Sequence, residues 1–175
     1  RISHNILINF LTFNNSKNFQ MHCNIDYLIS SKERKVLITG AAGNLGRLIS
    51  KTLASIGYEL ILVDLESKRF CEFIKEIKSQ NEVEIKYFFC DLEIESERDQ
   101  LISNIKRKYS EINCLINNAA FVGTRNLDGW NVPYEEQSLK TWRRCFEVNL
   151  TAPFHLSQKL SPIMSKAKNP TIINV

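Results

Sequence analysis

Short apolar runs alternate with amphipathic segments from residue 35 to the end of the chain. The short runs predict strands at residues 35–39, 58–63, 83–89 and 113–116, with a fifth beginning near Thr171. Apolar residues at helical spacing predict helices at 44–56, 70–77 and 95–109, and another from Ser138 onward. Apolar strands separated by amphipathic helices predict a parallel sheet covered on both faces. The expected fold class is therefore α/β with a doubly wound parallel sheet.

The last expected helix carries large apolar residues along one face. Ser138 is a plausible N-cap for it, because a serine side chain can accept a hydrogen bond from a backbone N–H in the first turn. We expect Trp142 and Phe146 to lie in the core rather than on a binding face. Pro153 is expected to kink this helix or to start a new turn. The inner face is expected to contain Leu139, Trp142, Phe146 and Asn149.

The two ends of the chain differ from its middle. Residues 1–34 are rich in Asn and Ser and follow no sustained strand or helix period, so we expect a poorly ordered leader. Residues 35–175 are expected to form one domain. The chain stops at a β-branched run, residues 171–175, which suggests a fragment whose sheet is incomplete at the C-terminus.

Composition narrows the possible classes of protein. The 175 residues are 43% hydrophobic and 24% charged, an ordinary globular balance. The net charge of +4 is too small and too scattered to indicate nucleic acid or membrane binding, and no apolar run approaches the ~20 residues that span a bilayer. Five cysteines are spread singly, without the spacing of zinc ligands, so we expect no metal site. Reduced thiols in a cytoplasmic protein are the simplest interpretation.

A glycine pattern lies between the first expected strand and the first expected helix. Gly40, Gly43 and Gly46 form G-x-x-G-x-x-G, which permits a tight turn and lets a diphosphate approach the backbone at a helix N-terminus. Asp64 ends the next strand, at about the spacing of a carboxylate that binds a ribose diol. Such a carboxylate would repel the 2′-phosphate of NADP, so NAD is favoured, although Lys68 and Arg69 lie close enough to weaken this preference.

Together with these features, four further segments make the chain similar to the short-chain dehydrogenase/reductase family. The resemblance covers roughly residues 35–175 and implies a Rossmann fold that binds NAD(P). The family's glycine motif matches Thr39 to Gly46, with Asn44 and Leu45 inside it. The other matching segments are Asp91-Leu92, Asn117-Asn118-Ala119-Ala120, residues 147–154 with Asn149, and Ile172-Ile173-Asn174-Val175.

The resemblance also implies roles for individual residues. The cofactor is expected to contact Gly40, Gly43, Asn44, Leu45, Gly46, Asp64, Asp91, Leu92, Asn118, Ala119 and Ala120. Asn149 matches the family's active-site Asn and would hold a water that links the catalytic lysine to solvent. The family's catalytic Ser and Tyr-x-x-x-Lys pair are expected after residue 175, so the chain as given is expected to bind dinucleotide poorly and to be inactive.

The implied activity is NAD(P)-dependent hydride transfer between a nicotinamide and a hydroxyl or ketone of a small substrate. Relatives often pair through the helix that contains Asn149, so a homo-oligomer is expected. Two departures keep alternatives open, because the middle glycine lies one position early at Gly43 and Ala120 replaces a glycine. The alternatives are an extended-type nucleotide-sugar epimerase or dehydratase, and a non-catalytic dinucleotide-binding module.

Overall fold

The protein is described here by a computed structural model that covers residues 34–121 and 127–175. The leader expected at residues 1–34 therefore lies, except for Arg34, outside the described residues. In chain order the elements are β1 (Lys35–Thr39), α2 (Asn44–Ser55), β2 (Glu59–Asp64), α3 (Lys68–Gln80), β3 (Ile85–Phe89), α4 (Glu95–Lys108), β4 (Cys114–Asn117), η2 (Tyr134–Glu136), α5 (Leu139–Phe146), η3 (Glu147–Thr151), α6 (Ala152–Met164) and β5 (Thr171–Asn174).

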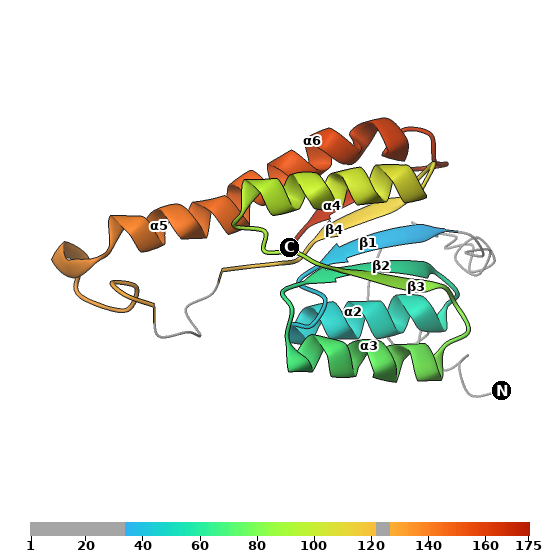
Figure 1. Ribbon diagram of the computed structural model, residues 1–175, viewed down its shortest axis with the longest axis horizontal. Helices are drawn as coiled ribbons and strands as arrows, with labels where there is room; N and C mark the ends of the chain where they lie inside the picture. Colours follow the sequence, from blue (N-terminus) through green and yellow to red (C-terminus); the bar gives the residue numbers. More distant parts are fainter. Residues whose placement is uncertain (1–33, 122–126) are drawn as a thin grey trace, which may run out of the picture.

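The five strands form one parallel sheet in the order β3-β2-β1-β4-β5 (Figure 1). The chain moves outward from β1 through β2 to β3, then crosses back to place β4 on the other side of β1. This reversal confirms the doubly wound α/β fold expected from the sequence. It also creates a crevice beyond the carboxyl ends of β1 and β4, where ligands bind in such folds.

Two apolar cores lie on opposite faces of the sheet because neighbouring strand residues point to opposite sides. In β1, Val36 and Ile38 pack in the core with α2 and α3, whereas Leu37 packs in the core with α4 and α6. Figure 1 shows α2 and α3 on one side of the sheet and α4 and α6 on the other. Phe70 and Phe73 of α3 are fully buried, as the periodicity of that segment predicts.

The last helical segment is one long rod with a wider turn in its middle. Ser138 caps its start, since the Ser138 side chain accepts a hydrogen bond from the N–H of Thr141 at 3.3 Å. The backbone changes from α5 to a π-helix, η3, and returns to α-helix just before Pro153. A wider turn at this point accommodates the missing N–H of proline.

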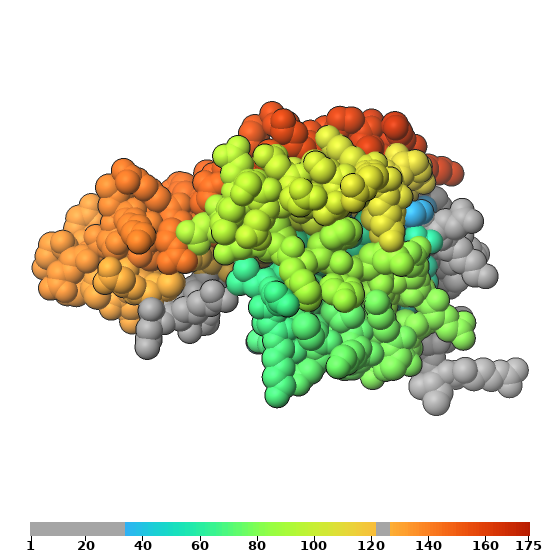
Figure 2. Space-filling view, viewed as in Figure 1, coloured from blue at the N-terminus to red at the C-terminus, as the bar shows by residue number. Residues whose placement is uncertain are grey.

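The expectation that Trp142 and Phe146 lie in the core is wrong. Their exposed fractions are 53% and 43%, and Leu139 is exposed as well. The reason is that α5 extends beyond the end of the sheet, so no described element covers this face (Figure 1). Figure 2 shows the same segment, in orange, projecting from the body of the molecule.

Candidate functional site

A tight corner joins β1 to α2 at the carboxyl edge of the sheet. Gly40 has a φ of +64°, a left-handed conformation that favours glycine, and the N–H of Gly43 donates to the carbonyl oxygen of Gly40 at 3.1 Å. Helix α2 begins at the next residue, and no side chain of the described residues caps its first turn. The corner therefore presents the positive end of a helix dipole and backbone N–H groups to the crevice.

Gly46 allows the first turn of α2 to press against this corner. A Cβ at residue 46 would lie 2.2 Å from the carbonyl oxygen of Gly40 and 2.9 Å from the Cα of Ala41. Both are backbone atoms, which cannot rotate away. Gly46 thus sits behind the corner and shapes it, rather than lying on the wall of the cavity.

The Asp64 side chain faces the same corner from the end of β2. Its Oδ2 accepts a hydrogen bond from the N–H of Ala42 at 2.7 Å, and its Oδ1 accepts one from the N–H of Leu65 at 2.8 Å. The carboxylate therefore holds Ala42, the third residue of the glycine turn, in place. A carboxylate oxygen can accept more than one hydrogen bond, so this arrangement is compatible with a ribose diol as an additional donor.

Asn118 and Thr39 brace the other side of the corner. The Thr39 Oγ1 accepts hydrogen bonds from the backbone N–H groups of Asn118 and Ala119 at 3.0 and 3.1 Å. In return, the Asn118 Nδ2 donates to the carbonyl oxygens of Thr39 and Gly40 at 3.0 and 3.1 Å. These contacts lock the end of β4 to the end of β1.

A cavity of about 820 Å³ opens between the corner, the ends of β2 and β3, and the loop after β4. This volume is typical of small-molecule sites, which span roughly 300–1,000 Å³. The cavity wall includes ten of the eleven residues for which the sequence predicts cofactor contact: Gly40, Gly43, Asn44, Leu45, Asp64, Asp91, Leu92, Asn118, Ala119 and Ala120. Residues up to 80 positions apart in the chain are thus brought together at one edge of the sheet.

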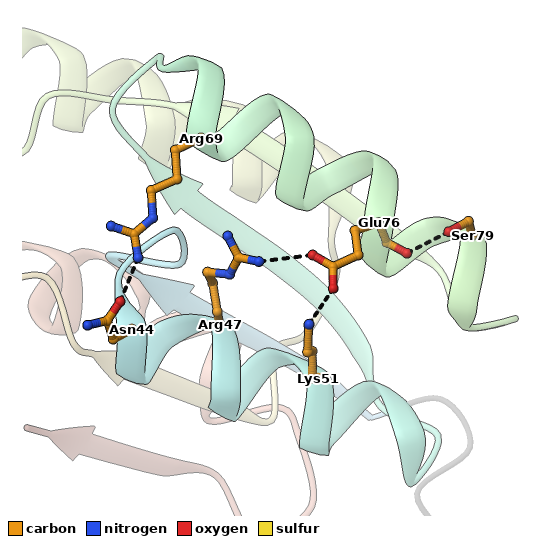
Figure 3. A network of polar contacts seen from close by, with 6 residues as sticks. All are labelled: Asn44, Arg47, Lys51, Arg69, Glu76 and Ser79. Atoms are coloured by element: carbon orange, nitrogen blue, oxygen red, sulfur yellow. Dashed lines mark hydrogen bonds and ion pairs between the residues drawn. The ribbon is translucent and has the colours of Figure 1, made fainter.

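Besides Glu66, three charged side chains on the cavity wall were not part of the predicted site. The Arg144 Nε donates to the Glu93 Oε1 at 2.7 Å, and its guanidinium lies over the ring of Phe121, 5.2 Å from the ring centroid. The hydrogen bond from Arg144 to Glu93 raises the pKa of Arg144. The third side chain, Arg69, donates from Nη2 to the Asn44 Oδ1 at 2.6 Å (Figure 3). Its place near Asp64 in the sequence was the only advance signal.

A second polar contact further along α2 and α3 holds the two helices together. Arg47 and Lys51 of α2 both bind the carboxylate of Glu76 in α3, and the Arg47 Nη2 to Glu76 Oε2 distance is 2.9 Å (Figure 3). The hydrogen bond from Lys51 lowers the pKa of Glu76. Since Arg69 and Asn44 bridge the same helices at the rim of the cavity, α2 and α3 are joined at both places.

Asn149 lies on η3, beside the cavity rather than on its wall. Its Oδ1 accepts a hydrogen bond from the N–H of Phe121 at 2.6 Å, and its Nδ2 contacts the Cys145 Sγ at 3.3 Å. Asn149 therefore fixes the loop that follows β4, whose residues Ala119 to Phe121 form part of the cavity wall.

The end of β3 contributes Cys90 and Asp91. Burial raises the pKa of the Cys90 thiol to about 12, so this thiol is protonated and unreactive near neutral pH. Asp91 does not cap α4, because the helix begins at Glu95 after Ile94. Instead the Asp91 Oδ1 accepts the N–H of Glu93 at 3.0 Å, which leaves the carboxylate at the cavity wall.

Two classes of feature are absent from the part of the chain that the structure describes. Residues 34–121 and 127–175 contain no group of three or more His, Cys, Asp or Glu side chains that could hold a metal ion. None of the helices in these ranges has the length and apolar character that a bilayer crossing requires.

Comparison with known proteins agrees with this geometry. The family model described as short chain dehydrogenase matches residues 34–175. The chain is 30% identical over 150 residues to a short chain dehydrogenase/reductase, dpfgG, of Gibberella zeae, covering 85% of this chain and 53% of that protein. It is 27% identical over 143 residues to a 7alpha-hydroxysteroid dehydrogenase of Bacteroides fragilis, covering 80% and 52%. The chain thus spans about half the length of the curated relatives it matches.

Solved structures of oxidoreductases are also similar to this chain. A short chain dehydrogenase of Escherichia coli CFT073 in complex with NADPH has 26% sequence identity and a TM-score of 0.69, over 81% of this chain and 57% of that one. The oxidoreductase yciK from E. coli gives 26% identity and a TM-score of 0.69, over 81% and 56%. With a family model that matches its whole sheet and the corner that lines its cavity, the chain belongs to the short-chain dehydrogenase family.

Proposed function

We propose that this chain forms the nicotinamide-dinucleotide site of an oxidoreductase that interconverts a hydroxyl and a carbonyl group on a small substrate. The observation that carries the proposal is the cavity bounded by the uncapped start of α2 on one side and by the Asp64 carboxylate on the other. A helix N-terminus favours a diphosphate, and a neighbouring carboxylate accepts hydrogen bonds from a ribose.

The residues present fit such a cofactor. Gly43 lies on the cavity wall, and among the described residues a Cβ there would meet only the carbonyl oxygen of Gly40 within 4 Å, so the space above the turn is open to a diphosphate. Asp91 and Leu92 line the far part of the cavity, where a carboxylate and an apolar side chain suit an adenine. We therefore assign the diphosphate to the turn at 40–45, the adenosine ribose to Asp64, and the adenine to residues 91–92.

The chemistry that a bound nicotinamide supplies is hydride transfer to or from a substrate carbon. The part of the chain described here contributes binding and orientation. The N–H groups at the start of α2 offset the diphosphate charge, Asp64 orients the ribose, and Asn118 keeps β4 joined to the corner. Asn149, whose Oδ1 accepts a hydrogen bond from the Phe121 N–H, fixes residues 119–121 of the cavity wall.

NAD is proposed as the preferred cofactor. Its support is the Asp64 carboxylate, because a 2′-phosphate beside it would bring two negative charges together. Two features act in the other direction. Arg69 lies on the same cavity wall, and two structural relatives were solved with NADPH or NADP. Asp64 is therefore expected to set the preference and Arg69 to reduce it.

Titration of the isotope-labelled full chain with NAD tests this proposal. The expected result is saturable movement of backbone amide resonances at residues 40–46, 64–66 and 91–93, with weaker binding of NADP. ADP-ribose, which contains the diphosphate and adenosine but no nicotinamide, is expected to compete. If millimolar NAD moves none of these resonances, or moves them no more than free ribose does, the proposal is wrong. Turnover is then measured in the whole protein by the absorbance of reduced nicotinamide.

The whole protein is also proposed to associate with a second copy of itself. The support is a stripe of exposed apolar side chains that repeats every three or four residues along α5, η3 and α6, and so lies on one helical face. The stripe consists of Leu139, Trp142, Phe146, Leu150 and Phe154.

A cytoplasmic location is proposed as well. Its support is the scattered single cysteines, four of which are free thiols in the described residues.

Leu150→Glu is expected to shift the whole protein toward the monomer in sedimentation velocity, because it places a charge in an apolar contact. Leu48→Glu is the matched control, since Leu48 on α2 is 63% exposed and Leu150 is 61% exposed. The control is expected to sediment as the unmodified protein does. Equal behaviour of the two variants would show that the stripe is not the contact.

A further inference from the structure

Arg98 on α4 is a charged side chain in the middle of an otherwise apolar contact. It is 1% exposed, although its neighbours on the inner face of α4 are Leu101, Ile102 and Ile105. Taking a guanidinium out of water costs several kcal/mol unless partners compensate for the lost hydration. The apolar packing between α4 and α6 already holds the two helices together. Cohesion alone therefore does not account for an arginine here.

The partners of Arg98 lie on the segment that follows β3 and on the long helical segment formed by η3 and α6. Its Nη1 donates to the carbonyl oxygen of Leu92 at 2.5 Å, and its Nη2 donates to the Glu147 Oε1 at 2.6 Å. Its Nε faces the His155 Nδ1 at 3.4 Å. The other ring nitrogen of that histidine lies 3.5 Å from the Asp99 Oδ1, so a proton on Nε2 leaves Nδ1 free to accept from the arginine.

These contacts connect the two halves of the candidate site. Leu92 is on the cavity wall where the adenine is proposed, and Glu147 lies two residues before Asn149 on η3. A second ion pair, between Arg144 and Glu93, also joins the segment after β3 to the long helix. In this pair the arginine is on the long helix and the carboxylate is on the segment after β3. The segment after β3 is thus tied to the long helix by two ion pairs, one to Arg144 on α5 and one to Glu147, the first residue of the π-turn.

We propose that Arg98 is a positioning residue that couples the adenine side of the cavity to Asn149. Movement of the Leu92 carbonyl is passed through one guanidinium to Glu147, and from η3 through Asn149 to the Phe121 N–H. The inference rests on the proposed function only for the identity of the ligand. The coupling itself is a property of this chain and can be measured without a ligand.

The test compares Arg98→Met with Arg107→Met in the full chain. Arg107 lies on the same helix, is exposed, and within the described residues its side chain donates a hydrogen bond to the Asn104 Oδ1 at 2.8 Å. Because Arg98→Met leaves Glu147 without its partner, the double variant Arg98→Met with Glu147→Gln provides a version without an unpaired carboxylate. The measurement is amide hydrogen exchange followed by nuclear magnetic resonance.

The Phe121 amide is expected to exchange roughly tenfold faster in both Arg98 variants, while amides of β1 and β2 keep their rates. ADP-ribose is expected to slow exchange at Phe121 in the unmodified chain and in Arg107→Met, and to lose this effect in the Arg98 variants. An unchanged rate at Phe121, or a uniform acceleration of all amides, overturns the proposal. If ADP-ribose binds nowhere, the proposed function fails, whereas the ligand-free rates still decide the role of Arg98.

Discussion

Replacing Gly46 with alanine is expected to destabilise the chain by about 3 kcal/mol or more and to abolish dinucleotide binding. Helix propensity alone predicts the opposite sign, because alanine is favoured over glycine inside a helix by about 1 kcal/mol. Steric overlap is the larger effect here. The new Cβ would lie 2.2 Å from the carbonyl oxygen of Gly40. Gly40 cannot move away from it, because the backbone of Ala119 packs closely against Gly40. Urea denaturation of the full chain measures the change.

Gly43→Ala is the matched control for this experiment. Its φ of −66° suits any residue, and in the part of the chain that the structure describes its Cβ would meet only the carbonyl oxygen of Gly40, at 3.1 Å. A cost of about 1 kcal/mol is expected, mainly from placing alanine at the start of a helix. Since the new methyl group would occupy the open space above the turn, NAD binding is expected to weaken while the fold persists. Equal stabilities of the two variants would contradict the assigned role of Gly46.

The sequence could predict the glycine corner and Asp64 because both depend on short stretches of chain. A tight turn requires glycine wherever it occurs, and the end of an apolar strand can be located by composition. Once the strands are parallel, their carboxyl ends must meet at one edge, so Asp64 has to face Gly40. This is why local patterns were sufficient for the glycine corner and Asp64, whereas the other cofactor contacts were expected only from the resemblance to the family.

The rest of the site depends on how distant helices pack, which local patterns do not contain. Arg144 and Glu93 are 51 residues apart, and Arg98 and Glu147 are 49 apart. Nothing in either segment indicates its partner. The misplacement of Trp142 has the same cause, because helical spacing identifies an apolar face but not whether another element covers it.

Asp64→Asn is expected to weaken NAD binding by about tenfold to a hundredfold, because hydrogen bonds to a charged acceptor contribute roughly 1.5–3 kcal/mol. NADP affinity is expected to fall much less or to rise, since the carboxylate that opposes the 2′-phosphate is gone. Asparagine keeps the shape of the side chain and one acceptor oxygen for the Ala42 N–H, so the corner is retained, although the Leu65 N–H loses its side-chain acceptor. Titration calorimetry with each cofactor gives the ratio of dissociation constants.

Arg69→Ala is the paired variant that separates charge from shape. Arg69 contacts Asn44 at the rim of the same cavity, so its removal is expected to reduce NADP affinity more than NAD affinity. The two variants thus move the cofactor ratio in opposite directions, and their combination is expected to fall between them. If Asp64→Asn lowered the affinity for both cofactors by the same factor, the carboxylate would be holding the turn through Ala42 without discriminating between the two riboses.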